Sequence, residues 1–169
     1  MVDQSRPKAA PAGVVVRLLS AGYDLLILFG LEFLIFIPIT IVEQTIGVTP
    51  EWIKGVLVIA VAWAYLTGFW QRSGETTGMR PWSLRLAMVE SGDLPTAQAC
   101  AIRFVALMIT WLTLALTITM VLLDRTQNAT YALLGLVPMA SMISLLVTPN
   151  RQPLHDLLAG TNVYRVGGN

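Results

Sequence analysis

Long apolar stretches separated by short polar segments dominate the pattern of this chain. The stretches cover residues 14–42, 53–70, 97–123 and 129–148. Each approaches or exceeds the roughly 20 apolar residues that an α-helix needs to cross the hydrocarbon core of a bilayer. The pattern therefore predicts an all-α membrane protein with four transmembrane helices. The polar residues 1–13 would form an N-terminal tail. Residues 14–169 would form one transmembrane domain, whose last two spans are joined by a tight turn at 124–128.

Two polar segments predict small structures outside the membrane. LRLAMV, residues 84–89, has the character of a strand, and SGD, residues 91–93, is a turn signal. The segment TNVYRV near the C-terminus could pair with this strand in a small β-hairpin. PLHDLLA, residues 153–159, begins with a first-turn proline and precedes Gly160, a helix stop. It predicts a short amphipathic helix at the cytoplasmic surface.

Composition supports the membrane assignment and excludes other classes. Hydrophobic residues make up 55% of the chain and charged residues 12%, whereas soluble domains carry about 25% charged residues. The net charge is only +1, without a dense basic tail, so we expect no nucleic-acid partner. One His and one Cys form no cluster suited to zinc or haem, and the sequence predicts no metal or cofactor.

Basic residues predict the orientation, because Lys and Arg resist translocation more than acidic residues do. If the spans alternate in direction, nine of the 11 basic residues fall on one side of the membrane, and only Lys54 and Arg125 fall on the other. We therefore expect a multi-pass protein of the cell inner membrane, with both termini in the cytoplasm.

The first span carries charges that an apolar helix does not need. Arg17 and Asp24 are seven residues apart, which places them within about 20° on a helix, and Asp24 is about 10 Å deeper. An unpaired charge there would cost roughly 2.5–3.5 kcal/mol, so Asp24 needs a partner, a proton or water. Arg103 on the third span is a candidate partner. Glu32 lies near mid-membrane with no obvious basic partner, so it is either protonated or faces water.

Polar side chains recur on one face of each of the last two spans. The stripes are Thr110, Thr113 and Thr117 on the third span and Ser141 and Ser144 on the fourth. Because such a stripe avoids lipid, we expect both stripes and the polar face of the first span to meet around a hydrated or hydrogen-bonded interior.

The short C-terminal helix adds charge at the same end of the bundle. His155 and Asp156 lie in its first turns, where they would face the end at which Arg17 and Arg103 emerge. Together with Asp24, the two arginines and two aspartates would form a neutral set.

These positions resemble a known family. An arginine at the start of the first span, an aspartate within it and a second aspartate in HDLLAGT resemble the RDD family of small membrane proteins. The three positions in this chain are Arg17, Asp24 and Asp156. The resemblance covers about residues 14–166, because TTGMRPWSLRLAMVESGDLPT is similar to the family's central loop. Met79 and Ser83 replace the Lys and Gly of the family's T-x-G-K-x-x-x-G-L-R-V pattern.

The resemblance implies an integral membrane protein, with ion or small-solute transport as the usual proposal. Ionisable groups within spans tend to mark ion or proton routes. Asp24 and Glu32 are therefore candidates to exchange a proton or a monovalent cation. The positive charges of Arg17 and Arg103 would adjust the pKa of the exchanging carboxyl group. The alternative is an accessory or assembly subunit, in which Arg17, Asp24 and Asp156 form a structural ion-pair lock.

Two further expectations follow from size and motifs. Four short spans are few to enclose a solute path, so a transporter of this size should be a homo-oligomer in the lipid bilayer, whereas an accessory subunit would bind other membrane proteins. The chain has neither a G-x-S-x-G nor an H-E-x-x-H motif, so we predict no catalytic residues and no enzymatic activity.

Overall fold

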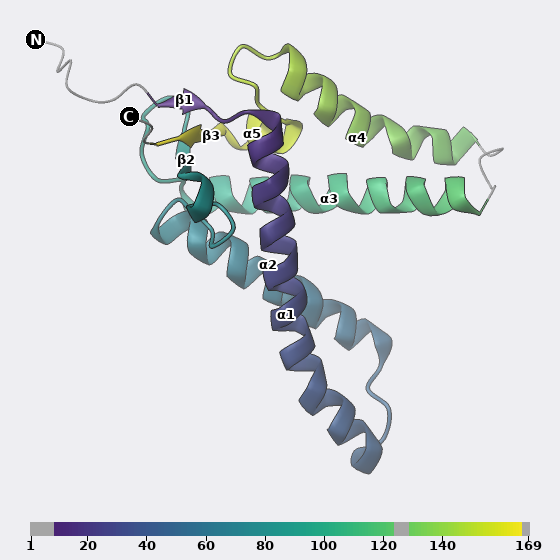
Figure 1. Ribbon diagram of the computed structural model, residues 1–169. Helices are drawn as coiled ribbons and strands as arrows, with labels where there is room; N and C mark the ends of the chain where they lie inside the picture. Colours follow the sequence, from purple (N-terminus) through teal and green to yellow (C-terminus); the bar gives the residue numbers. More distant parts are fainter. Residues whose placement is uncertain (1–8, 124–128, 167–169) are drawn as a thin grey trace, which may run out of the picture.

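The computed structural model describes residues 9–123 and 129–166. The expected turn at 124–128 and most of the expected N-terminal tail lie outside these residues. In chain order the elements are β1 (Ala10–Pro11), α1 (Val14–Ile46), α2 (Glu51–Arg72), the 3-10 turn η1 (Arg80–Trp82), β2 (Leu84–Met88), α3 (Ala97–Leu122), α4 (Ala129–Val147), α5 (Leu154–Ala159) and β3 (Thr161–Arg165). The strands and α5 lie at one end of the molecule, here called the sheet end, and the α1–α2 and α3–α4 pairs extend from it in different directions (Figure 1).

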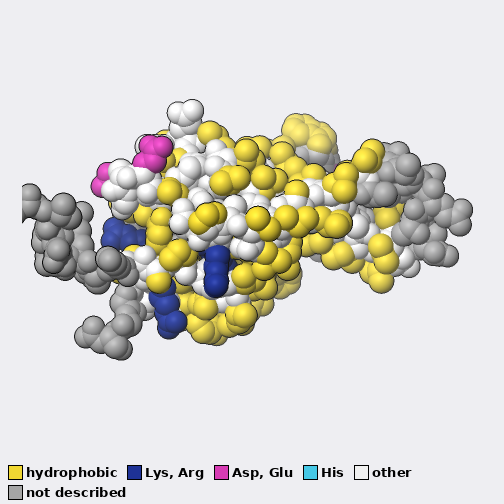
Figure 2. Space-filling view, turned by 90° about the horizontal axis from the view of Figure 1, so that it is seen from above, with side chains coloured by type: hydrophobic (Ala, Val, Ile, Leu, Met, Phe, Trp, Pro, Cys, Tyr) yellow, Lys and Arg dark blue, Asp and Glu magenta, His cyan; other side chains and the backbone are white. Residues whose placement is uncertain are grey.

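Among the residues that the structure describes, three helices are long and apolar enough to cross a membrane. They are α1, α2 and α3, and no residue in the most apolar stretch of α1 is buried within the protein. Figure 2 shows apolar side chains over most of the described surface in that view, with charged side chains gathered toward the sheet end. Such surfaces are stable against acyl chains rather than water. The apolar part of α4 whose side chains are described, Leu133–Val147, is shorter, so a fourth span stays a prediction.

The connection between α1 and α2 is fixed by one carboxylate. Glu43, near the end of α1, accepts a hydrogen bond from the backbone N–H of Thr49 at 2.8 Å. Its carboxylate also pairs with Lys54 on α2 at 3.1 Å. These polar contacts connect α1 to α2 at the end of the pair far from the sheet. They also neutralise the charge of Lys54, which is expected to lie on the side of the membrane away from the cytoplasm.

A three-stranded antiparallel sheet closes the other end, with the strand order β1-β3-β2. The predicted pairing is confirmed, since Leu86 on β2 lies opposite Val163 on β3. The sequence did not predict β1, a two-residue strand from the expected tail that pairs with the outer side of β3. Next to it, the N–H of Ala12 donates to the carbonyl of Val163 at 2.9 Å, so the chain enters α1 directly from the sheet.

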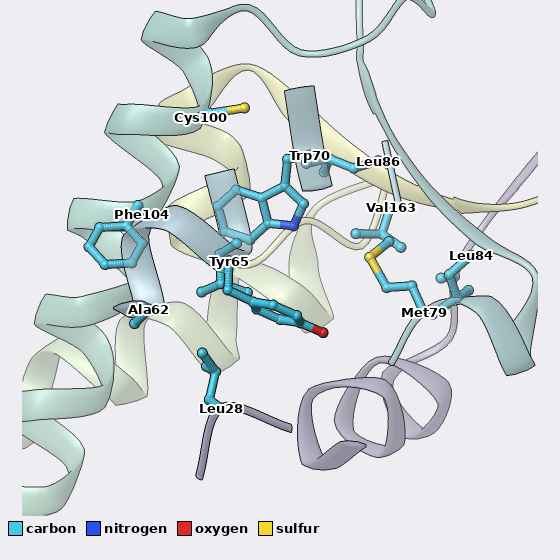
Figure 3. Close-up of a cluster of buried hydrophobic side chains, with 12 residues drawn as sticks. Leu28, Ala62, Tyr65, Trp70, Met79, Leu84, Leu86, Cys100, Phe104 and Val163 are labelled. Atoms are coloured by element: carbon cyan, nitrogen blue, oxygen red, sulfur yellow. The ribbon is translucent and has the colours of Figure 1, made fainter. Parts of the chain in front are cut away.

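The hydrophobic core lies between the sheet and the parts of α1, α2 and α3 that face it. Figure 3 shows side chains from α1, α2, α3 and the sheet converging there. The labelled members are Leu28, Ala62, Tyr65, Trp70, Met79, Leu84, Leu86, Cys100, Phe104 and Val163. Their burial fixes the start of α3 and the end of α2 against the strands, and thereby positions the polar groups described below.

The predicted short helix α5 is confirmed, and it begins one residue later than predicted, at Leu154. Pro153 precedes it as the N-cap, and Gly160 ends it with φ = 64°, a left-handed conformation that glycine adopts without steric penalty. The helix buries Asp156 and Ala159 and exposes Leu157 and Leu158. The helix is therefore amphipathic: Asp156 faces the interior, and the two leucines face outward.

Candidate functional site

The carboxylate of Asp156 is held by two arginines from different membrane helices. Arg17 at the start of α1 donates from Nη1 to Oδ2 at 2.9 Å. Arg103 in the second turn of α3 donates from Nη1 to Oδ1. The Asp156 residue is fully buried, with 0% of its surface exposed. We call these three residues the ion-pair cluster.

Arg17 also ties the cluster to the strands. Its Nη2 donates to Asn162 Oδ1 at 2.6 Å and to the carbonyl of Val163 at 3.1 Å. Its Nε donates to the carbonyl of Ala12 at 3.0 Å. Arg17 thus connects the start of α1 to β3 and α5 through one side chain, and all of its nitrogens have acceptors.

Arg103 is more deeply buried than Arg17 and less completely paired. Its guanidinium lies 4.6 Å from the ring centroid of Trp70, a cation–π distance, and its Nη1 is 3.4 Å from the hydroxyl of Thr161. That hydroxyl also donates to Asp156. Within the described residues the Nε of Arg103 is buried without an acceptor.

The ion-pair cluster carries a net charge of +1, because one carboxylate faces two guanidinium groups. Burial alone would raise the pKa of Asp156, but Arg103 and Arg17 outweigh it and hold the pKa below its ordinary value. Beside them, burial lowers the pKa of His155 to about 4, despite the attraction of Asp156. His155 is therefore neutral at pH 7 and adds no further positive charge.

Asp24 forms a second, separate cluster. Its Oδ1 accepts from the hydroxyl of Tyr65 on α2 at 2.7 Å and from the N–H of Gly78 at 3.0 Å. Its Oδ2 accepts from the hydroxyl of Thr76 at 2.5 Å. We call these four residues the Asp24 cluster. It joins the middle of α1 to α2 and to the loop that leads to η1.

Neither candidate arginine is the partner of Asp24, for which the sequence left a charged partner, a proton or water open. Arg17 and Arg103 both bind Asp156, and Asp24 is satisfied by two hydroxyl groups and one backbone N–H instead. Neutral donors suffice because three hydrogen bonds can replace the solvation of one carboxylate.

Gly78 allows the loop to approach this carboxylate. A Cβ atom at this position would lie 2.7 Å from Oδ1 of Asp24 and 2.5 Å from the carbonyl oxygen of Ser20. Either distance is shorter than a carbon and an oxygen tolerate, so a side chain would displace the loop from α1.

Glu32 differs from the other acids of the first span. It lies farther along α1, beyond the core, and it is half-buried. Among residues 9–123 and 129–166 the structure gives its carboxyl group no hydrogen bond or ion pair. Glu32 is not one of the three signature positions, and the sequence predicts it near mid-membrane.

The two polar stripes do not meet around a shared interior with α1. Thr110, Thr113 and Thr117 each donate to a carbonyl of their own helix three or four residues earlier. Thr117 lies against Gly135 of α4. On α4, Ser144 donates to the carbonyl of Gln152 at 2.7 Å, and the buried Ser141 accepts from the N–H of Leu154 at 3.3 Å. The α4 stripe therefore anchors the segment that leads into α5.

Sequence reasoning missed the neutral residues of both clusters. Tyr65, Thr76 and Asn162 were not selected, although each supplies a close contact to a signature residue. The signal for Thr76 and Gly78 was present in the T-x-G start of the central loop, which matches TTG in this chain. Across the described part of the chain, no group of three His, Cys, Asp or Glu side chains lies close enough to hold a metal ion.

The apolar helices and the buried charged clusters at their sheet end define a multi-pass helical membrane protein. The sequence model of the RDD family matches residues 11–160, and the chain belongs to this family. No curated protein and no solved structure matches it.

Proposed function

We propose that the chain is the protomer of an oligomeric transporter of the cell inner membrane, which exchanges protons for monovalent cations through Glu32. The observation that carries the proposal is the half-buried Glu32 carboxyl group, which has no protein partner among the described residues of an apolar span. A carboxyl group in this position is costly unless it binds a proton, a cation or water, and such groups tend to lie on ion routes.

The position of Glu32 fits an exchanging group better than that of Asp24. Asp24 already accepts three hydrogen bonds, and a cation would have to displace Tyr65 or Thr76 to reach it. Glu32 lies eight residues farther along the same helix, about 12 Å deeper by helical rise. We therefore assign exchange to Glu32 and a structural role to the two clusters.

An oligomer would complete the route. In Figure 1 the α1–α2 and α3–α4 pairs diverge from the sheet end. The large apolar side chains near Glu32, Phe29, Phe33 and Leu34, are exposed, so this part of the α1 surface is open in the single chain. A carboxyl group on this face avoids acyl chains if a second protomer covers it. The same arrangement, with both termini in the cytoplasm, would place the two clusters at the inner surface of the membrane.

Proton flux in proteoliposomes tests this proposal. With a pH-reporting dye inside, a gradient of sodium or potassium should drive proton movement for the unchanged protein, and Glu32→Gln should abolish it. Glu90→Gln, in the exposed turn after β2, removes the same charge away from α1; it is the control and should retain flux. Equal flux for Glu32→Gln and the unchanged protein would reject Glu32 as the exchanging group.

The second candidate is an accessory or assembly subunit of a larger membrane complex. It is favoured by the ion-pair cluster, whose contacts join α1, α3, α5 and β3 as a structural lock would. In that case every cation gradient should give no flux, and a specific membrane protein should co-purify with the chain from native membranes.

A further inference from the structure

An open groove of about 560 Å³ lies at the sheet end, on residues that neither cluster uses. Its polar lining is formed by Ser73 and Glu75 after α2, Arg80 in η1, and Ser83 and Arg85 at the start of β2. Leu84 and Val166 complete it. A volume of this order is typical of sites for small ligands.

The groove carries an excess of positive charge with unused donors. Arg80 and Arg85 face a single acid, Glu75, and the contact between Arg80 Nε and Glu75 Oε1 is a long 3.4 Å. It leaves both terminal nitrogens of Arg80 without an acceptor in the described residues. Arg85 is exposed and makes no ion pair within the same part of the chain. The groove therefore offers guanidinium groups whose hydrogen-bonding capacity is unsatisfied.

The backbone that holds these arginines is fixed. The loop after α2 is attached to α1 through the Asp24 cluster, and the N–H of Leu86 donates to the carbonyl of Gly74 at 2.6 Å. Ser83 adopts φ = 52°, and its carbonyl accepts from the N–H of Val166 at 2.8 Å. A site on a fixed backbone loses less entropy on binding than a mobile one.

We propose that this groove binds a phosphate-bearing anion. Each guanidinium group can donate two parallel hydrogen bonds to phosphate oxygens, which lysine cannot do. Two arginines together therefore offer up to four such bonds. The hydroxyl group of Ser83 is a further donor, whereas that of Ser73 already donates to backbone carbonyls. The Arg80 guanidinium lies 5.9 Å from the ring of Phe69, in the last turns of the apolar helix α2, so a lipid headgroup reaches it as readily as a soluble phosphate compound.

Two binding measurements distinguish the sources. Native mass spectrometry of the detergent-purified protein, offered equal phosphatidylglycerol and phosphatidylcholine, reports a lipid headgroup site. Calorimetric titration with inorganic pyrophosphate reports a soluble ligand. We expect Arg80→Gln with Arg85→Gln to weaken the binding observed by about tenfold or more, because charged hydrogen bonds are lost.

The control variant changes the same charge outside the groove. Arg72→Gln with Arg151→Gln removes two exposed arginines that do not line it, and it should change affinity by less than about threefold. Glu75→Gln should strengthen binding, because it releases Arg80 and removes a negative charge. All variants should unfold at the same temperature as the unchanged protein, since the altered side chains are at least partly exposed.

Either selective binding of phosphatidylglycerol or binding of pyrophosphate, lost in the groove variant alone, supports the site and names its source. Equal losses in the groove and control variants would reduce the effect to general surface charge and overturn the proposal. Failure to bind either probe would overturn it as well. These results are independent of ion flux, so they do not depend on the transport proposal.

Discussion

At the scale of single residues, Asp156 is the acid on which most of the buried charge depends. It is fully buried and binds Arg17 and Arg103, so Asp156→Asn would leave two buried guanidinium groups without a counter-charge. We expect a loss of about 3–5 kcal/mol in the free energy of unfolding, measured by denaturation in detergent. Asp93→Asn in the exposed turn after β2 should change it by less than about 0.5 kcal/mol. Unchanged stability in the Asp156 variant would contradict the geometry of the cluster.

Gly78 makes a second prediction at this scale. Gly78→Ala places a methyl group against Asp24 and Ser20, so the loop must move and the hydrogen bond from its N–H must lengthen. The expected loss of unfolding free energy is about 1–3 kcal/mol. Gly68→Ala in α2 is the matched control, since a methyl group there meets nothing within 4 Å. If both variants unfold alike, the loop does not approach Asp24 as closely as described.

His155 predicts how stability depends on pH. Its pKa falls from 6.5 to about 4 on folding, because burial disfavours the charged form. Between these values the unfolded chain binds more protons than the folded one, so stability decreases as the pH falls from 6.5 toward 4. The loss should be on the order of 2–3 kcal/mol. His155→Gln should remove most of the pH dependence above pH 5, where few carboxyl groups titrate, and an unchanged slope would show that His155 is not buried as a neutral side chain.

At the scale of elements, the threonine stripe on α3 has a different role from the one its spacing predicts. Each hydroxyl group is already bonded to a carbonyl of α3, so replacing it by a methyl group leaves no donor unsatisfied elsewhere. Thr117→Val should therefore change the unfolding free energy by less than about 1 kcal/mol and leave proton flux intact. A strong loss of flux with unchanged stability would restore the hydrated interior that the sequence suggested.

The elements that could be predicted are those with a local signal. The length of the apolar stretches predicts the membrane helices, and Pro153 and Gly160, which mark the two ends of a short helix, predict α5. Alternation and turn residues predict the pairing of β2 with β3. The strand β1 has only two residues, one of them Pro11, so no pattern along the chain could reveal it. Its pairing depends on where β3 lies in space.

The sequence identifies the residues of the candidate site but not which of them bind one another. Arg17, Asp24 and Asp156 carry the family pattern, and the structure brings Arg17 to Asp156 across 139 positions of sequence. Helical geometry places Asp24 on the same face as Arg17 but left the pairing of the two arginines and two aspartates open. The sequence could not resolve it, because α5 brings the carboxylate of Asp156 to both arginines, and this arrangement has no local signal.

At the scale of the whole molecule, the two clusters connect the membrane helices to the sheet. The ion-pair cluster joins the starts of α1 and α3 to α5 and β3, while the Asp24 cluster joins α1 to α2 and the central loop. Beyond them the helical pairs diverge, and their apolar faces are exposed (Figure 1). Stability should therefore be concentrated at the sheet end, and the proposed ion exchange is assigned to the divergent helices.

A double-mutant cycle tests this separation of charges most directly. Unfolding free energies in detergent would be measured for Arg17→Met, Asp156→Asn and Asp24→Asn, alone and in both combinations with Arg17→Met. The structure predicts a coupling of more than about 1 kcal/mol between Arg17 and Asp156, and of less than about 0.5 kcal/mol between Arg17 and Asp24. A stronger coupling of Arg17 to Asp24 than to Asp156 would contradict the account.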